Sequence, residues 1–434
     1  MNKFIFTFRD FFINRRKRDY LITFGTEMFV FLSGLMLYRF ASVFLQNNDF
    51  SVYALCRRTI SLLIPLLVLG MGVGIPRYVA YAVANKNNTD EKEFFITGLL
   101  TSLLFTFLFV ILHLCFSSFF SHLYFGSEAY THLIFPICVA VFALVMHSLV
   151  YSYYRGKMNF VVGNLLQFIN LGVIPFFVFY IFRNLFYILL LTGLFNILIT
   201  IIFVIPVFLK IQSYAFNFSK KLNILLNYGI QRLPGDFALS ALLSLPAYFV
   251  THTQGVEIAG YVAFGISLIT MAGSFFAPLS LILLPQISQL LAEKKYLLIR
   301  KDVKRIIIIT FVLTMVGIIV YESFSEYILM LYLTNYSNEL LLITRIVFIG
   351  SIGYTMYVSL RSVLDAYYIK AINTRNIIIS FCLFLLISVF VLKCETYLYI
   401  LIAFIISLIF LGFITYFESE KLIKKLIHQQ KETL

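Results

Sequence analysis

The sequence predicts an all-α protein that crosses a membrane about twelve times, and two observations lead to this prediction. Hydrophobic residues make up 61% of the 434-residue chain and charged residues only 12%, and the mean hydropathy of +0.93 lies far above that of soluble domains. Apolar stretches long enough to span a bilayer recur along the whole chain. We predict helices at residues 20–44, 52–83, 94–117, 132–153, 161–182, 186–209, 224–250, 256–283, 305–325, 340–368, 376–392 and 397–416.

The basic residues between these stretches predict the orientation of the chain. They gather in alternate loops, beginning with the cluster at residues 15–18, whereas the intervening loops hold little beyond Arg183 and Lys393. By the positive-inside rule both termini are expected in the cytoplasm, and the even number of helices agrees with this. The formal net charge of +14 reflects this bias, so it does not indicate nucleic acid as a partner.

A polar break after the sixth predicted helix divides the chain into two halves. We expect residues 1–19 to form a cytoplasmic or interfacial segment and residues 20–209 a first lobe of six helices. Residues 210–223 are expected to form a cytoplasmic linker, 224–416 a second six-helix lobe and 417–434 a basic cytoplasmic tail. Because each half holds an even number of helices, both halves enter the membrane from the same side.

Signatures of soluble catalysis are absent from the sequence. It contains no G-x-x-x-x-G-K-[ST], no G-x-S-x-G and no H-E-x-x-H, and its five cysteines lack C-x-x-C spacing. The polar breaks are also too short to fold a separate catalytic or nucleotide-binding domain. The sequence therefore predicts a protein that is not an enzyme and that uses no metal and no cofactor.

Arginines inside apolar stretches are the unusual feature of this chain. A guanidinium at the centre of a lone transmembrane helix costs roughly 2.5–3.5 kcal/mol, so several of them predict a hydrated interior or an anionic ligand. They are Arg39, Arg57, Arg58, Arg77, Arg232, Arg345 and Arg361. Arg57 and Arg58 are adjacent and cannot point the same way on a helix, so at least one is expected to reach outward.

Two of the arginines have an acidic residue four positions later. Arg232 precedes Asp236 and Arg361 precedes Asp365, so each pair shares one helix face. Such pairs can neutralise each other. They can also act as salt-bridge gates that release an arginine for an anion or a carboxylate for a coupling cation.

The predicted helix at residues 52–83 contains backbone-breaking residues. Gly70 and Gly74 form a G-x-x-x-G face around Gly72, which permits close helix packing, and Pro76 removes a backbone donor immediately before Arg77. Broken backbone at membrane depth is tolerated only where protein or a water-filled cavity satisfies it. We therefore predict that these residues bend or gate the helix.

The predicted helix at residues 224–250 is expected to be a second broken one. Pro234 and Gly235 follow its first turns. With a start near Asn223, Asp236 lies about 20 Å along the axis, close to the middle of the membrane. A carboxylate there is a candidate ion or proton site, and a kink with a locally paired acid is the alternative.

Four stretches of the sequence carry a resemblance to a known family. They are LGMGVGIPRYVA at 69–80, YRGKMNF at 154–160 with the following polar residues, QRLPGDFAL at 231–239 and RSVLDAYYIKAINTRN at 361–376. They resemble bacterial Wzx-type polysaccharide-biosynthesis flippases of the multidrug/oligosaccharidyl-lipid/polysaccharide exporter superfamily, over essentially the whole chain. The resemblance implies a MATE-like fold, with two six-helix lobes around a central cavity.

The resemblance also implies a function and a substrate. Such a protein flips polyprenyl-pyrophosphate-linked oligosaccharide across the bacterial cytoplasmic membrane for O-antigen, capsule or similar polysaccharide synthesis, by alternating access driven by an ion gradient or the membrane potential. Its expected partners are the lipid-linked oligosaccharide, membrane lipids and the polymerase and glycosyltransferase machinery. On this interpretation, the pyrophosphate is bound by Arg77, Arg232, Arg39, Arg345 and Arg361. The candidate sugar contacts are Tyr38, Tyr151, Tyr153, Asn164, Gln167, Asn170 and Tyr354.

Three alternatives remain open at this point. A MATE-like exporter of small cationic molecules would favour an acidic cavity, which the surplus of arginines opposes. A peptidoglycan-precursor flippase usually has two further helices. A membrane glycan polymerase or ligase typically needs a sizeable external loop, whereas the outer breaks here are short.

Overall fold

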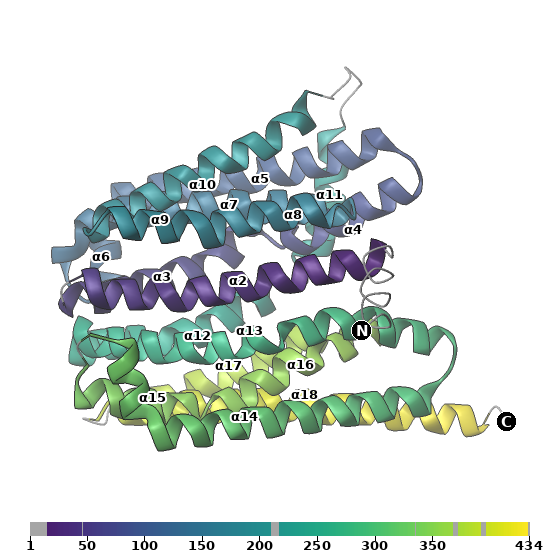
Figure 1. Cartoon of the computed structure of the whole chain (residues 1–434). Helices are drawn as coiled ribbons and strands as arrows, with labels where there is room; N and C mark the ends of the chain where they lie inside the picture. Colours follow the sequence, from purple (N-terminus) through teal and green to yellow (C-terminus); the bar gives the residue numbers. More distant parts are fainter. Residues whose placement is uncertain are drawn as a thin grey trace, which may run out of the picture. The chain divides into compact units, whose positions relative to one another are not determined.

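The computed structural model describes residues 15–45, 47–209, 217–334, 336–367, 372–391 and 396–432, and every regular element in these ranges is helical (Figure 1). The elements are α2 (Arg15–Phe44), α3 (Asn47–Val68), α4 (Met71–Ala84), α5 (Asn88–Cys115), α6 (Ser117–Phe125), η1 (Glu128–Leu133), α7 (Ile134–Gly156), α8 (Phe160–Gln167), η2 (Phe168–Val173), α9 (Ile174–Ile181), α10 (Leu185–Phe208), α11 (Phe218–Gly229), α12 (Leu233–Gln254), α13 (Val256–Ala292), α14 (Tyr296–Tyr332), α15 (Asn338–Phe348), α16 (Ser351–Tyr367), α17 (Ile372–Val391) and α18 (Leu398–Glu432).

The prediction of about twelve membrane spans is confirmed. Across the described ranges, 11 helices are long and apolar enough to cross a membrane, and the count reaches 12 when α15 and α16, bent by 41° at their junction, form one span. Residues 1–14 of the predicted N-terminal segment 1–19 and residues 210–216 of the predicted linker 210–223 lie outside the described residues.

Internal contacts divide the chain into two compact units, each assembled from three segments. Unit 1 comprises Met1–Phe44, Leu63–Phe120 and Ala129–Leu233, and unit 2 comprises Leu45–Leu62, Ser121–Glu128 and Pro234–Leu434. The two predicted lobes are continuous stretches, whereas these units exchange short segments. One helix, α3, therefore contributes most of its length to unit 2 and its last turns to unit 1.

Three tight turns between helices share one backbone geometry. Lys86, Met158 and Lys294 have φ values of 54–55°, in the left-handed region that commonly ends a helix. In each turn the N–H of this residue bonds to the carbonyl three positions back, and the next N–H bonds to the carbonyl five positions back. Asn87 and Asn159 then cap α5 and α8, because each side chain accepts a bond from the backbone N–H three positions later.

The second predicted helix breaks before Pro76 rather than at it. Leu69 and Gly70 adopt left-handed backbone conformations, with φ of 54° and 70°, and separate α3 from α4. Pro76 lies inside α4, where its missing N–H leaves the carbonyl of Gly72 without a helical donor. The hydroxyl of Ser152 on α7 donates to that carbonyl at 3.1 Å, so protein satisfies the exposed backbone group.

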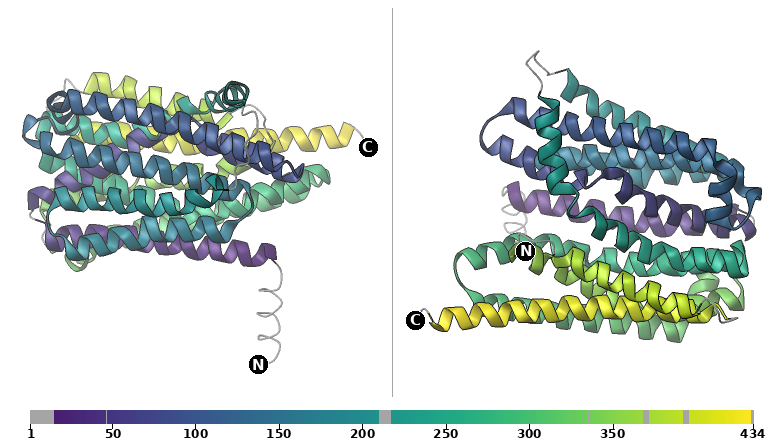
Figure 2. Two further views of the ribbon diagram at one scale, coloured as in Figure 1. Left: turned by 90° about the horizontal axis from the view of Figure 1, so that it is seen from above. Right: turned by 180° about the vertical axis from the view of Figure 1, so that it is seen from behind.

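The seventh predicted helix consists of two elements. α11 is a short separate helix that runs across the direction of the spanning helices of unit 1 (Figure 2, right), and α12 begins only at Leu233. Pro234 stands at the start of α12, where a missing N–H costs nothing. The prediction that Asp236 lies near mid-membrane was therefore wrong: it lies in the first turn of α12, where the helix dipole favours a negative charge.

Unit 2 packs largely around α16, which forms extensive contacts with both α13 and α18. α16 and α18 approach at backbone distance, because a side chain at Gly353 would collide with the carbonyl of Leu408, and one at Gly412 would lie 2.7 Å from the carbonyl of Gly353. Small residues allow such packing in a membrane, where no hydrophobic effect drives helices together.

Candidate functional site

Two of the predicted arginines meet at one aromatic ring in unit 1. The guanidinium carbon of Arg77 lies 4.5 Å from the ring centroid of Tyr228, and that of Arg232 lies 4.2 Å from the same centroid. Both distances are within the range of cation–π attraction. Neither guanidinium forms an ion pair within the part of the chain that the structure describes. The ring holds both cations while leaving their charge available.

Glycines bring the three residues together. A side chain at Gly70 would lie 2.5 Å from the carbonyl oxygen of Gly229, and one at Gly74 would contact Leu225 and Tyr228. α11 can therefore lie directly on the start of α4, as the predicted G-x-x-x-G face requires. Tyr228 consequently reaches Arg77, and Arg232 is held in the turn that follows α11 by a backbone hydrogen bond of 2.9 Å from its N–H to the carbonyl of Gly229.

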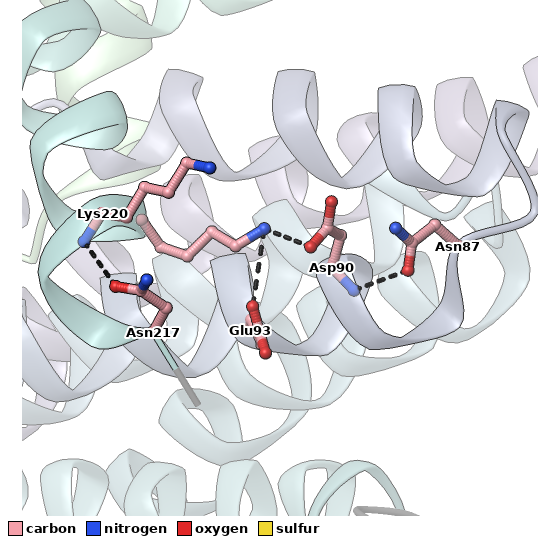
Figure 3. Close-up of polar contacts among 6 residues, drawn as sticks. Asn87, Asp90, Glu93, Asn217 and Lys220 are labelled. Carbon is pink, nitrogen blue, oxygen red and sulfur yellow. Dashed lines mark hydrogen bonds and ion pairs between the residues drawn. The ribbon is translucent and has the colours of Figure 1, made fainter. Parts of the chain in front are cut away.

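An ion-pair network fixes the other end of α11 to α5 (Figure 3). The Lys221 ammonium group pairs with Asp90 and, at 3.5 Å, with Glu93. It also lies 4.4 Å from the ring centroid of Phe94, and Lys221 is only 7% exposed. Asn217 caps α11 as Asn87 caps α5. This lysine thus holds in place the helix that carries Tyr228.

The predicted sugar-binding amides of unit 1 are buried between helices. The side-chain N–H groups of Asn164 and Gln167 donate to Thr23 at 2.8 Å and to Glu27 at 3.2 Å, and those of Asn170 donate to Thr200 at 2.8 Å. Asn164 and Gln167 thereby hold α8 against α2. Asn170 lies in the π-helical segment η2, a geometry that often marks functional positions. A role of these amides toward sugars stays a prediction.

Glu27 is a candidate site residue that the sequence analysis did not identify. It is a carboxylate inside the first apolar stretch, bonded to Gln167 and in electrostatic contact with Tyr151. The signal was available, since an ionisable residue inside a transmembrane helix is by default a functional candidate.

The predicted tyrosines of unit 1 have separate environments. Tyr151 lies against Arg155, whose guanidinium carbon is 5.5 Å from the ring centroid. The Tyr153 hydroxyl donates to Glu91 at 2.6 Å, and Glu91 also pairs with Lys157 at 2.8 Å. Tyr38 is fully buried in α2, beside the half-buried Arg39. The structure does not bring these residues to the ring of Tyr228.

In unit 2 the predicted arginines have partners of other kinds. The guanidinium of Arg345 pairs with the Glu322 carboxylate at 3.2 Å and donates to the Glu322 carbonyl at 2.7 Å. Arg361 interacts electrostatically with Tyr357 and Asp365, and Asp365 accepts a 2.8 Å bond from the side-chain amide of Asn373. Arg345 therefore shares its positive charge with a carboxylate.

Arg58 is a second residue whose position the sequence did not reveal. It is 6% exposed and donates to the hydroxyls of Ser267 at 2.6 Å and Thr270 at 3.3 Å. Tyr354 interacts electrostatically with both Arg58 and Arg361. Unit 2 therefore has two arginines near this one tyrosine. The adjacent Arg57 reaches Tyr53 instead. The described residues contain no group of three or more metal-ligating side chains placed to hold an ion.

Comparisons with known proteins identify the fold. No protein-family model and no curated protein matches the chain. An inward-facing multidrug resistance MATE family transporter of the MOP superfamily aligns with a TM-score of 0.73 and 13% identity, over 94% of this chain and 99% of the other.

Two further structures agree. A MOP superfamily transporter from Pyrococcus furiosus, described as having a binding pocket of reverse polarity, aligns with a TM-score of 0.67 and 14% identity over 94% of each chain. A eukaryotic MATE transporter aligns with a TM-score of 0.70 and 11% identity, over 96% of this chain and 99% of the other. At these identities the likeness establishes the architecture, and the chain has the MATE-like fold that the family resemblance implied.

Proposed function

We propose that this protein is a membrane transporter that flips polyprenyl-pyrophosphate-linked oligosaccharide across a bacterial cytoplasmic membrane for surface polysaccharide synthesis. The observation that carries this proposal is the pair of guanidiniums at the ring of Tyr228, neither of them ion-paired in the described ranges. Arg77 and Arg232 receive the pyrophosphate group. Polymerase and glycosyltransferase machinery would supply and consume the glycan.

The chemistry of the substrate matches this pair. A pyrophosphate carries several negative charges that need compensation when its headgroup leaves water, and planar guanidiniums bind phosphate oxygens through two parallel hydrogen bonds. A carboxylate partner would compete with the ligand for the same donors, whereas an aromatic face holds the cation without using them. Arg58 and Arg361 in unit 2 are the candidate cations for a later stage of transport.

Coupling to an ion gradient requires a group that can bind a cation. Glu27 meets this requirement because it lies within an apolar span and bonds to a neutral amide. Asp365 also bonds to a neutral amide, but it lies in the last turn of α16, and Asp236 lies in the first turn of α12. Binding of a proton or metal cation to its carboxylate would alter how α2 packs against α8. We propose that cation binding and release at Glu27, or the membrane potential, drives transport by alternating access.

A second candidate function is export of small cationic molecules. The same Glu27 carboxylate supports it, as does the likeness to structures described as multidrug resistance transporters. The Pyrococcus structure is described as having a pocket of reverse polarity and, from this, a different function. Polarity is therefore the property that decides between the two functions, and the cations at Tyr228 favour an anionic substrate.

The proposal is tested with Arg77→Ala and Arg77→Lys, purified and reconstituted in liposomes after equal membrane insertion is verified. We expect transbilayer movement of a lipid-linked glycan to fall at least about tenfold in the alanine variant, with partial recovery in the lysine variant, which keeps the charge but not the bidentate geometry. Arg183→Ala is the matched control, because its guanidinium lies 5.3 Å from the ring centroid of Phe44 in the same unit. Full activity in both Arg77 variants would refute the assigned role.

Export is measured in parallel. Cationic-drug efflux from whole cells that disappears in Glu27→Gln, together with an absence of glycan movement in the unmodified protein, would establish the second candidate instead.

A further inference from the structure

Helices α13, α14 and α18 of unit 2 are much longer than a bilayer is thick, and α13 has 37 residues. α14 has 37 residues and α18 has 35, which at a rise of 1.5 Å per residue gives about 55 and 52 Å. The hydrocarbon core measures about 30 Å. The C-terminal end of α18 lies on the same side of unit 2 as the turn between α13 and α14 (Figures 1 and 2). The extra turns of α14 and α18 therefore extend from the same side of unit 2.

These ends form a packed structure. Ile299 and Val303 of α14 share a buried apolar cluster with Ile423 of α18 and with the end of α13. Leu422 and Leu426 of α18 form a second buried cluster, against which Tyr296 packs. A common core fixes the positions of the outward-facing residues, so the surface that these helix ends present is built into the fold.

The outward face of this region is basic. Its exposed basic residues at the helix ends are Arg300, Lys301, Lys304, Arg305, Lys421, Lys424 and Lys425, here called the basic collar. The acidic residues interspersed among them are Asp302, Glu418 and Glu420. Glu418 is engaged with Arg375 at 2.8 Å. The collar therefore carries a net positive charge.

The collar continues the face that each helix exposes along its apolar span. On α18 exposed Phe410, Phe413 and Phe417 are followed at helical spacing by Lys421 and Lys424. The change from phenylalanine to lysine marks where this face leaves hydrocarbon and enters the headgroup layer.

α14 shows the same change in the opposite chain direction. Val316, Val312 and Ile308 are each about half exposed, and Lys304 and Lys301 continue their face. Leu297, which is 65% exposed, ends this stripe with an apolar side chain beside the basic ones. A leucine next to lysines is typical of a segment that lies at a membrane surface.

We infer that the basic collar binds the headgroups of anionic phospholipids in the adjoining leaflet. A soluble acidic protein could pair with the lysines. It would not explain why the collar continues the exposed apolar faces of both helices. Anionic lipid satisfies both features, because its phosphate meets the cations while its acyl chains meet Phe413, Phe417 and Ile308. This inference does not depend on the transported substrate.

Lipid binding by the purified full chain tests the inference. Native mass spectrometry gives the apparent Kd for phosphatidylglycerol and for phosphatidylcholine with the same acyl chains, at two salt concentrations. We expect the unmodified protein to prefer phosphatidylglycerol and to lose that preference at high salt. The triple variant Lys421→Gln/Lys424→Gln/Lys425→Gln should bind phosphatidylglycerol about tenfold more weakly, because each cation near an anionic surface contributes.

Two further variants separate this effect from misfolding or general loss of charge. Lys86→Gln/Arg183→Gln/Lys220→Gln removes the same charge from exposed positions in unit 1 and should keep the preference. Glu420→Gln removes an acidic residue from the collar region and should strengthen phosphatidylglycerol binding about twofold, which misfolding cannot produce.

Three results would overturn the inference. They are equal affinity of the unmodified protein for the two lipids, equal loss in the unit 1 control, and unchanged phosphatidylglycerol binding in the collar variant. If that variant instead loses only polyprenyl pyrophosphate, the collar belongs to the transported substrate rather than to membrane lipid.

Discussion

In unit 1, Arg77 and Arg232 lie against the ring of Tyr228, whereas in unit 2 Arg345 lies against a carboxylate and a carbonyl of Glu322. All three arginines occur in apolar stretches, and hydropathy alone treats them alike. Their partners decide what they can do, because a carboxylate cancels a positive charge and an aromatic ring only positions it. The comparison identifies unit 1 as holding the better candidate for an anion site.

The largest expected effect comes from disturbing the backbone contact behind that site. Gly70→Ala places a side chain 2.5 Å from the Gly229 carbonyl at a residue with φ of 70°, and we expect it to cost about 2–4 kcal/mol of stability. Thermal unfolding in detergent measures the effect. Gly72→Ala is the control, because the nearest atom to its added carbon is a side-chain methyl at 3.4 Å. Equal stability of the two variants would show that α11 does not need this close approach.

The next effect concerns the anchor of α11. Lys221→Met removes the cation that pairs with Asp90 and Glu93, and we expect a loss of about 1–2 kcal/mol, discounted because the Asp90 side chain is 40% exposed and screened by water. The neighbouring exposed lysine gives the control, Lys220→Met. Proteolysis at the end of α11 should also accelerate in Lys221→Met alone. If Lys221→Met were as stable as the unmodified protein, the ion pairs of Lys221 would not be what holds α11 in place.

A smaller effect is expected at the ring itself. Tyr228→Leu removes the aromatic face shared by both guanidiniums and should lower the affinity for inorganic pyrophosphate about fivefold, in line with about 1 kcal/mol of cation–π attraction. Tyr228→Phe keeps the ring and should bind as the unmodified protein does. Isothermal titration measures both variants. Equal weakening by phenylalanine would assign the role to the hydroxyl.

The smallest effect is expected in unit 2. Arg345→Ala removes a half-exposed ion pair, and such pairs contribute no more than about 1 kcal/mol. We expect glycan transport in liposomes to be unchanged and the unfolding temperature to fall slightly. A transport defect as large as that of Arg77→Ala, at equal stability, would erase the distinction between the two units.

Hydropathy predicted the spans well, because each span averages about twenty residues and no single misread position changes the sum. The start of α12 was missed because proline inside a helix and proline at its first turn look identical in one sequence. The G-x-x-x-G spacing predicted a close approach, but not that Gly229 would be the partner. That pairing joins residues distant along the chain.

The candidate site followed the same division. Arg77 and Arg232 stood out because cations are rare in apolar sequence, and the structure brings both to one ring. Tyr228 could not be identified from the sequence, because tyrosines are abundant in this chain. A tyrosine that binds two guanidiniums differs from one that anchors a helix at the membrane interface only in the residues around it. The burial of Arg58 could not be predicted either, since only the folded chain shows which of two adjacent arginines turns inward.

Arg58 of α3 is synthesised long before the residues that accept its hydrogen bonds. Arg58 leaves the ribosome with the first helices, yet the hydroxyls of Ser267 and Thr270 that receive its hydrogen bonds lie 209 and 212 residues later. At a translation rate of about 5–20 residues per second, a charged residue inside an apolar helix waits roughly 10–40 s for these hydroxyls to be made. Until Ser267 and Thr270 have been made, water, lipid headgroups or another part of the chain must solvate the Arg58 guanidinium in their place.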